Sequence, residues 1–177
     1  LLNNNRTAGY YESAYEQFEM ICNKIQANKK EAPKFVSAET TAKNWDGYGP
    51  ELMIDGNSGT RFASLSPTGD VEFVLSFNEK SNINAMTFEQ YVSVRNASDG
   101  FEIWVWDGKD YQLVFEGTDL GDESDATGQY FASKTVTFKT VATEKVKVII
   151  KSGYVGEPSF WEIKPLQLRK GSEPGSD

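Results

Sequence analysis

The sequence predicts an all-β protein, an antiparallel β-sandwich, preceded by one N-terminal α-helix. Short segments alternate apolar with polar residues, as at Val71, Phe73 and Leu75. Turn-forming residues separate these segments, and no helical periodicity comes between them after residue 35. Before residue 35 the apolar residues recur at helical spacing instead. We therefore expect a helical linker over 1–34, a β-sandwich over 35–170 and a flexible tail over 171–177.

The N-terminal segment predicts one amphipathic helix. Ser13 and Glu16 have the spacing of a capping box. Phe18, Ile21 and Ile25 then follow at helical intervals. A helix that connects the sandwich to an upstream domain of the same polypeptide explains this pattern. A coiled-coil partner helix is the alternative interpretation.

A hairpin is the clearest signal among the predicted strands. Residues 107–110 (Asp-Gly-Lys-Asp) form a turn sequence, and an alternating segment lies on each side of it. We expect further strands from Phe35 onward and in segments 71–77, 136–138, 146–150 and 163–168. The segment 118–133 is polar and acidic, so we expect a surface loop there.

The charge balance excludes two classes of partner. The formal net charge is -8, whereas nucleic acids and anionic lipid surfaces require clustered Lys and Arg. No apolar run is long enough to insert into a membrane. A neutral ligand such as a glycan suits this composition, and we expect a monomer. The chain begins with Leu rather than Met, which suggests an excised piece of a longer protein.

The absence of histidine restricts the chemistry further. With no His and one cysteine, Cys22, the chain cannot build a Ser-His-Asp triad, a Cys/His zinc site or an intrachain disulfide. Its 26 acidic residues form no recognisable catalytic motif, so we assign no catalytic residue. A small glycosidase that uses two carboxylates remains an alternative.

The segment 55–60 (Asp-Gly-Asn-Ser-Gly-Thr) concentrates oxygen donors around two glycines. Calcium takes six to eight oxygen ligands from carboxylates, hydroxyls and backbone carbonyls. A loop of this kind can supply several of them, and a distant carboxylate would complete the set. From spacing alone a plain turn is the favoured interpretation of the same residues.

Residues 55–57 and 60–64 resemble the D-G-N-x-x-T-R-W-x-S signature of discoidin domains, with Phe62 in place of the usual Trp. These domains are also called coagulation factor 5/8 type C domains and include the family 32 carbohydrate-binding modules. Further resemblances follow in order at 71–77, 101–108 and 159–163, so that the similarity covers about 36–169. The segment 86–91 also resembles C-terminal domains of bacterial fucosidases.

The resemblance implies a galactose-binding-like jelly roll with a structural calcium ion. In the family this ion joins the early Asp-Gly-Asn loop to the last strand. The implied ligands are the carboxylates of two acidic residues, one Thr oxygen and two backbone carbonyls: Asp55, Glu162, Thr60, Leu52 and Asn57.

Loops at one end of the sandwich supply the candidate sugar-binding residues. The loop 45–49 holds two aromatic residues, and segments 91–96 and 151–156 bring further aromatic and polar groups. By resemblance, an Arg and an Asn bind sugar hydroxyls and an aromatic ring stacks on the sugar. The candidates are Tyr48, Tyr91, Arg95, Asn96 and Tyr154. Many members also use a His near positions 64–66, and this chain has none there.

These observations predict a non-catalytic module that recognises a galactose-, GalNAc- or fucose-type sugar. It would target an attached enzyme, such as a fucosidase, or a surface protein. We expect it outside the cytoplasm, at the cell surface, in the periplasm or secreted. A protein-interaction or adhesion domain without sugar binding is the alternative.

Overall fold

The computed structural model describes residues 5–27, 31–93, 100–121, 130–151 and 157–169. Two compact units, Leu1–Ala32 and Pro33–Asp177, divide the chain. The predicted tail over 171–177 lies outside the described residues.

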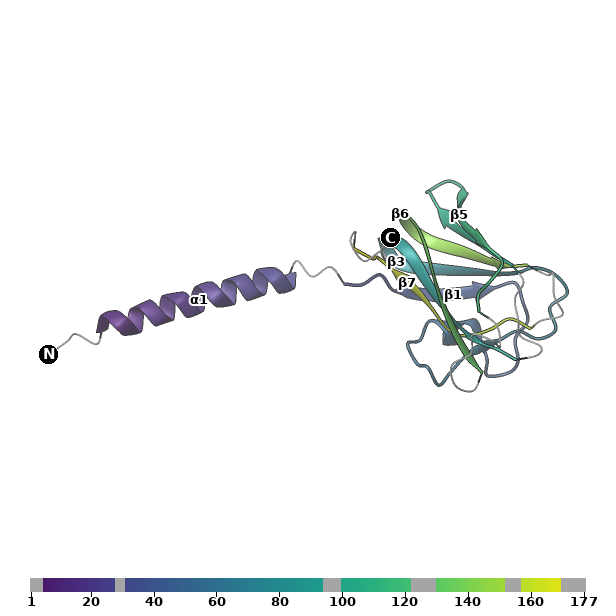
Figure 1. Ribbon diagram of the computed structural model, residues 1–177, viewed down its shortest axis with the longest axis horizontal. Helices are drawn as coiled ribbons and strands as arrows, with labels where there is room; N and C mark the ends of the chain where they lie inside the picture. The colour runs from purple at the N-terminus through teal and green to yellow at the C-terminus, as the bar shows by residue number, and fades with distance from the viewer. Residues whose placement is uncertain (1–4, 28–30, 94–99, 122–129, 152–156, 170–177) are drawn as a thin grey trace, which may run out of the picture. The chain divides into compact units, whose positions relative to one another are not determined.

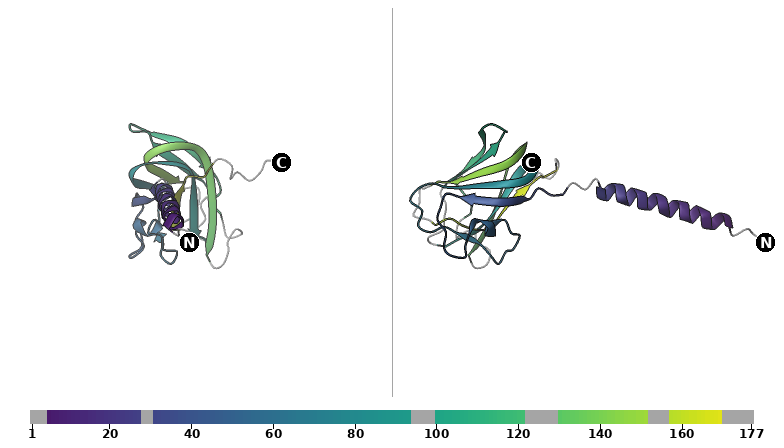
Figure 2. Two further views of the ribbon diagram at one scale, coloured as in Figure 1. Left: turned by 90° about the vertical axis from the view of Figure 1, so that its left-hand side faces the viewer. Right: turned by 180° about the vertical axis from the view of Figure 1, so that it is seen from behind.

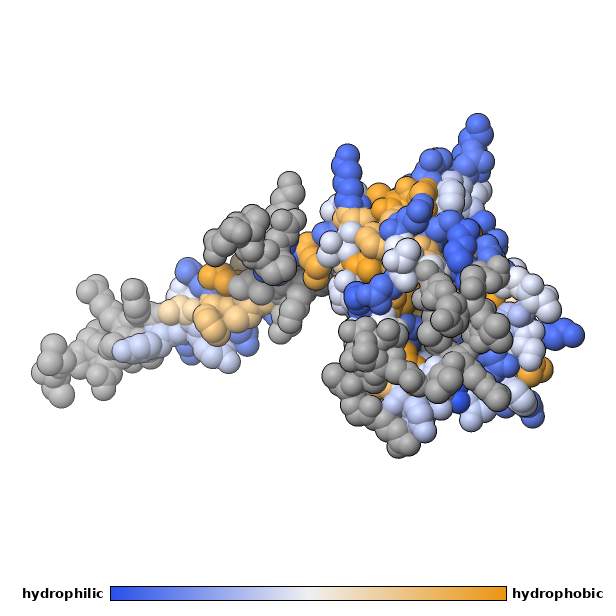
Figure 3. Space-filling view, turned by 45° about the vertical axis from the view of Figure 1, so that its right-hand side comes forward, coloured by the Kyte–Doolittle hydropathy of each residue, from blue (hydrophilic) through white to orange (hydrophobic). Residues whose placement is uncertain are grey.

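The first unit is the helix α1, Asn5–Ala27. It begins before Ser13, so the capping-box residues lie within the helix rather than at its N-terminus. The described side chains of α1 include large apolar residues that are exposed, among them Tyr15 at 65% and Phe18 at 62%. Apolar side chains are visible on the surface of α1 in Figure 3. In the described part of the chain, neither α1 nor any other helix has the length and apolar character of a membrane span.

The second unit is an antiparallel β-sandwich (Figure 1). Every strand pair that the structure describes is antiparallel, in the order β2-β7-β3-β6-β4-β5, with β1 paired to β3. The elements are β1 (Phe35–Thr40), the 3-10 helix η1 (Pro50–Met53), β2 (Phe62–Ala63), β3 (Val71–Tyr91), β4 (Phe101–Trp106), β5 (Tyr111–Gly117), β6 (Phe131–Ile150) and β7 (Ser159–Leu166).

Two long strands, β3 and β6, belong to both layers of the sandwich. The first part of β3 pairs with β1 and with the end of β6, where Leu75 lies opposite Val146. The last part of β3 pairs with β7 and with the start of β6, where Phe88 lies opposite Ile163 and Lys134. The β6 ribbon bends between these regions in Figure 2. The predicted fold class, a β-sandwich with one N-terminal helix, is therefore confirmed.

Aromatic side chains fill the space between the layers. Phe62, Phe73, Phe88 and Phe160 are fully buried. The ring of Phe73 meets those of Phe62 and Phe160 edge to face, with centroids 5.2 and 5.7 Å apart. Edge-to-face packing aligns the positive ring edge with the negative face of its neighbour. This core fixes β2 against β7, and both strands lead into the loops described next.

The predicted hairpin is confirmed between β4 and β5. The backbone N–H of Asp107 donates to the carbonyl of Asp110 at 3.0 Å, and Gly108 has φ +105°, a conformation that favours glycine. The predicted loop over 118–133 was wrong at its end, because β6 already begins at Phe131.

Candidate functional site

The loop 54–61 connects η1 to β2 and holds three of the five predicted calcium ligands, Asp55, Asn57 and Thr60. Met53 is fully buried and anchors the end of η1 in the core. The loop then reverses at Gly56, whose φ of +76° is strained for residues with a Cβ atom. Asp55 stabilises this turn because its Oδ1 accepts the backbone N–H of Asn57 at 2.8 Å. The loop therefore folds back on the Asp55 carboxylate.

Two acceptor oxygen atoms lie within hydrogen-bond distance of the Thr60 hydroxyl group in this loop. The Oγ1 of Thr60 lies 2.7 Å from Oδ2 of Asp55 and 2.9 Å from the backbone carbonyl oxygen of Asn57. A Thr hydroxyl has a single proton, so it can donate to only one of these acceptors at a time. The cluster thus holds more oxygen lone pairs than protons, which is the character of a cation-binding loop.

Glu162 of β7 brings a second carboxylate to the same loop. Its side chain is only 3% exposed and is in hydrogen-bond contact with the Asp55 carboxyl group. The Oε1 atom of Glu162 is buried without a hydrogen-bond partner among the described residues. Burying an unpartnered carboxylate oxygen is costly, and a bound cation would remove that cost.

The register of β2 and β7 explains why these residues meet. Phe62 lies opposite Phe160, and the pairing is antiparallel. Continued before the start of β2, the same register would place Arg61 beside Trp161 and Thr60 beside Glu162. The Arg61 guanidinium carbon lies 5.7 Å from the centroid of the Trp161 ring, so the pairing of β2 with β7 brings this loop close to β7.

The pKa values of the two carboxyl groups are shifted in opposite directions. Burial raises the pKa of Glu162 to about 7, and the hydrogen bond and negative charge of Asp55 add to this effect. Burial also acts to raise the pKa of Asp55, but hydrogen bonds from Thr60, the Asn57 N–H and Glu162 outweigh it, so its pKa lies below the usual value. In metal-free protein below about pH 7, Glu162 is therefore protonated, while the Asp55 carboxyl group is the one that ionises first.

The donor set fits Ca²⁺. It combines two carboxylates with a hydroxyl and a backbone carbonyl, all hard oxygen ligands. Among the described residues no three His, Cys, Asp or Glu side chains cluster to hold a metal, so such an ion would need these neutral oxygens as well. Leu52 lies in η1, beside the loop, and its predicted role as a carbonyl ligand stays a prediction.

We expect the metal-free protein to lose stability as the pH rises from 4.5 to about 7. The pKa of Glu162 is 4.5 in its ordinary state and about 7 in the folded protein, so in this range the folded state binds the proton that the unfolded state releases. Urea unfolding in a chelator, at a series of pH values, measures this change. Glu162→Gln is the control, and its free energy of unfolding should change less with pH over this range. An equal dependence on pH in both proteins would contradict the assignment to Glu162.

A hollow of about 440 Å³ lies beside the loop 54–61. Its lining combines three aromatic rings with an arginine and two acidic residues: Trp45, Tyr48, Tyr91, Arg61, Asp46, Glu157 and Ala63. Trp45 is 51% exposed, and its indole makes no ring stacking or cation–π contact within the described structure. The hollow therefore offers an open aromatic surface beside polar groups, the combination that sugar recognition requires.

Arg61 contacts two of the aromatic rings that line the hollow. Its guanidinium carbon lies 4.1 Å from the ring centroid of Tyr91 and 4.9 Å from that of Tyr48. Its Nη1 donates to Oγ of Ser159 at 2.6 Å, while this hydroxyl donates to the carbonyl of Phe62. These contacts hold the guanidinium in one orientation, which pre-organises its remaining N–H groups as donors.

The structure brings together two of the predicted sugar-binding residues, Tyr48 and Tyr91, in one lining. Arg95, Asn96 and Tyr154 lie outside the described residues. Trp45 and Arg61 line the same hollow but are not among the residues predicted to bind sugar. Trp45 lies in the loop 45–49, which was expected to bind sugar, and Arg61 directly follows the predicted calcium ligand Thr60, so their sequence positions could have indicated both.

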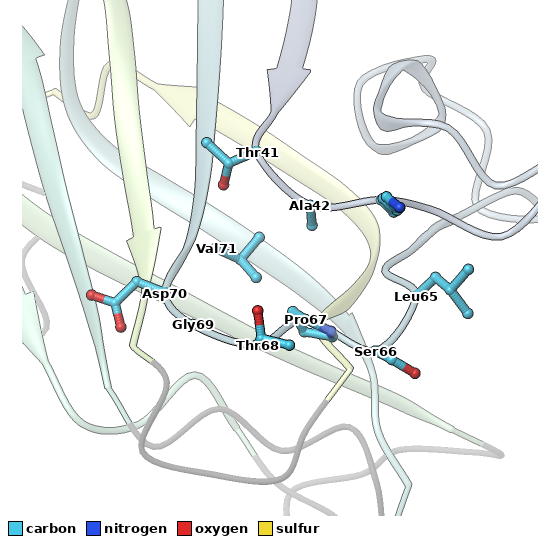
Figure 4. A pocket seen from close by; sticks show the side chains of 10 residues that line it. Thr41, Ala42, Leu65, Ser66, Pro67, Thr68, Gly69, Asp70 and Val71 are labelled. Carbon is cyan, nitrogen blue, oxygen red and sulfur yellow. The ribbon is translucent and has the colours of Figure 1, made fainter.

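A second hollow, also of about 440 Å³, lies between residues 41–43 and 65–71 (Figure 4). Ser66 lines it and has φ +42°, a strained value for a residue other than glycine. Glu157, from the lining of the first hollow, holds this conformation by accepting hydrogen bonds from the N–H and Oγ of Ser66 at 3.1 and 3.2 Å. The two hollows therefore adjoin each other at the Ser66–Glu157 contact.

Solved structures that match this fold include carbohydrate-binding modules. The Clostridium perfringens module CpGH89CBM32-5, in complex with GalNAc-β-1,3-galactose, matches with a TM-score of 0.61 and 22% identity over 74% of this chain and 94% of its own. Chitosan-binding module 2 of a chitosanase/glucanase from Paenibacillus sp. IK-5, in complex with chitotriose, matches with a TM-score of 0.63 and 16% identity over 76% and 98%. The chain has the fold of the family 32 carbohydrate-binding modules.

The family 32 module fold also occurs as part of a larger enzyme. A Ruminococcus gnavus GH29 fucosidase in complex with fucose matches with a TM-score of 0.59 and 15% identity, over 76% of this chain and 25% of that one. No family model and no curated protein matched the sequence. The resemblance inferred from the motifs is thus confirmed at the level of the fold.

Proposed function

We propose that this chain is a non-catalytic carbohydrate-binding module that binds a glycan in the hollow beside Trp45 and Arg61. The exposed Trp45 ring carries the proposal, because it offers a stacking surface for the C–H face of a sugar. The oriented Arg61 guanidinium supplies donors for sugar hydroxyls. Asp46 and Glu157 supply carboxylate oxygens in the same lining.

We further propose a structural calcium ion, held by Asp55, Thr60, Glu162 and the carbonyls of Leu52 and Asn57. The crowded oxygen atoms and the unpartnered Oε1 of Glu162 support it. When bound, the ion would neutralise the two carboxylates and join the loop to β7. The proposed ligands Thr60 and Glu162 are adjacent in the sequence to Arg61 and Trp161. The same ion would therefore also help to hold Arg61 in the glycan site.

The sugar in this proposal is neutral and of the galactose, GalNAc or fucose type. The net charge of -8 and the two acidic residues of the hollow disfavour an anionic sugar. One of the matched modules was solved with GalNAc-β-1,3-galactose, which is consistent with this class. The module would act as a monomer outside the cytoplasm and target an attached enzyme or surface protein to the glycan.

Hydrolysis by the Asp55–Glu162 pair is a poor alternative. The two carboxyl groups are in hydrogen-bond contact, whereas glycosidase pairs lie at least about 5 Å apart. Glu162 is also buried, so a substrate cannot reach it. We therefore treat this pair as a cation site.

Trp45→Ala is expected to weaken glycan binding about tenfold or more, because it removes the stacking surface, and a factor of ten corresponds to about 1.4 kcal/mol. A glycan array identifies the ligand, and isothermal titration calorimetry measures its Kd for both proteins. Tyr15→Ala removes an exposed aromatic ring from α1 and serves as the control. If a folded wild-type protein binds no glycan of the array, the proposal is wrong and a protein-interaction domain becomes the better explanation.

A further inference from the structure

A second group of aromatic rings continues from the hollow along the start of β6 and β7. The ring of Tyr91, which lines the hollow, stacks on the ring of Tyr130 with centroids 5.0 Å apart and planes inclined by 28°. The ring of Trp161 lies 5.9 Å from that of Tyr91. Arg61 joins these rings to the hollow, since its guanidinium carbon is also 5.7 Å from the ring of Trp161.

Tyr130 is held in an unfavourable backbone conformation at the end of this group. Its φ of +61° lies in the left-handed region, where residues with a Cβ atom are uncommon. The indole N–H of Trp161 donates to the backbone carbonyl of Tyr130 at 3.1 Å, and the Tyr91 ring packs against its side chain. Strained residues of this kind persist where surrounding contacts determine their position, and they concentrate at binding sites.

An exposed aromatic ring stands at each end of this group of residues. Trp45 is 51% exposed and lines the hollow together with Tyr48, Arg61 and Tyr91, whereas Tyr130 is 43% exposed and stacks on Tyr91. Between the two outer rings, the rings of Tyr48 and Tyr91 pack on the Arg61 guanidinium. Both outer rings keep surface available for a ligand.

We propose that the glycan site extends from the Trp45 hollow to Tyr130 and that the ligand is a linear oligosaccharide, with separate sugar units on the two exposed rings. The inference rests on the proposed function, because it assumes that Trp45 binds a sugar. Successive rings on a strip suit a chain, since each sugar unit has an apolar C–H face. Linked units also bind more tightly than single ones, because the second contact is intramolecular once the first has formed.

The test compares affinity against chain length in two variants. Calorimetry measures the Kd of galactose oligosaccharides from monomer to hexamer, and of GalNAc against GalNAc-β-1,3-galactose. We expect the wild-type affinity to rise with chain length. Tyr130→Ala should lower the affinity for the longest ligand that binds in a series about tenfold and leave the affinity for the shortest one unchanged. Trp45→Ala should lower the affinity for both.

Two further variants separate a ligand contact from a folding effect. Tyr130→Gly removes the ring but tolerates the positive φ, so it should reproduce the loss seen in Tyr130→Ala with an unchanged melting temperature. Tyr130→Phe retains the ring and should retain the affinity for long chains. Affinity that is independent of chain length, or a Tyr130→Gly variant with wild-type affinity at every length, would overturn the extended site and leave the Trp45 site intact. Absence of binding to both series and to the glycan array would instead refute the proposed function, and the extended site with it.

Discussion

Saturating calcium is expected to raise the melting temperature of this protein by roughly 8 °C. A ligand that binds only the folded state at a hundredfold excess over its Kd stabilises that state by about 2.7 kcal/mol, and 1 kcal/mol shifts the midpoint of a domain of this size by about 3 °C. The physical reason is local: the Asp55–Glu162 pair brings two carboxylates together with excess oxygen lone pairs. Differential scanning calorimetry in calcium and in a chelator measures the shift.

Glu162→Gln should not destabilise the metal-free protein, although it removes a proposed calcium ligand. It removes a buried carboxylate beside Asp55, so the metal-free variant should melt at or above the temperature of metal-free wild type at pH 8. The same variant should lose the calcium response. Glu116→Gln removes an equal charge from an exposed position on β5 and should retain the full response. A calcium-induced shift of equal size in all three proteins would show that the ion binds elsewhere.

Local patterns were sufficient to predict the hairpin and several strands. The turn at 107–110 combines Asp and Gly with alternating segments on each side, and local chemistry decides its structure. The lengths of β3 and β6 were not predictable in this way. The middle of β3 carries polar residues such as Ser81 and Asn82, which are typical of a loop. The strand continues there because these residues pair with Thr143 and Ala142 of β6.

The candidate site was predictable only in part, because strand pairing determines which residues meet. The resemblance predicted that Asp55 and Glu162 approach each other, and the structure places their carboxyl groups in contact. Trp161 lies on β7 and is half-buried. A register shift between β3 and β7 lies opposite it, so Phe160 and Ile163 both enter the core although strict alternation would separate them. No single-strand pattern reports such a bulge.

The register of β2 and β7 couples the two proposed sites. Thr60 and Arg61 are adjacent on one side, and Glu162 and Trp161 are adjacent on the other. A calcium ion that draws Thr60 and Glu162 together would also fix the distance between Arg61 and Trp161, which face each other one step along. We therefore propose that Arg61 would link metal binding to glycan binding.

Arg61→Ala is expected to weaken glycan binding about 10- to 100-fold, because hydrogen bonds from charged groups contribute about 1.5–3 kcal/mol. It should also lower the free energy of unfolding by about 2 kcal/mol, since the side chain packs on Tyr48, Tyr91 and Trp161. Calorimetric titration with the glycan that the array identifies, together with urea unfolding, measures the two effects on one sample.

Arg61→Lys separates these two roles of the side chain. Lys keeps the positive charge and an apolar stem over the rings but lacks the planar fork that bonds Ser159 and presents fixed donors. We expect it to recover most of the stability and little of the affinity. If Arg61→Lys binds the glycan like wild type, a positive charge at this position is sufficient for binding. If Arg61→Ala also binds the glycan like wild type and is as stable as wild type, the glycan does not contact this residue. Retained affinity in Arg61→Ala with reduced stability would assign Arg61 a purely structural role.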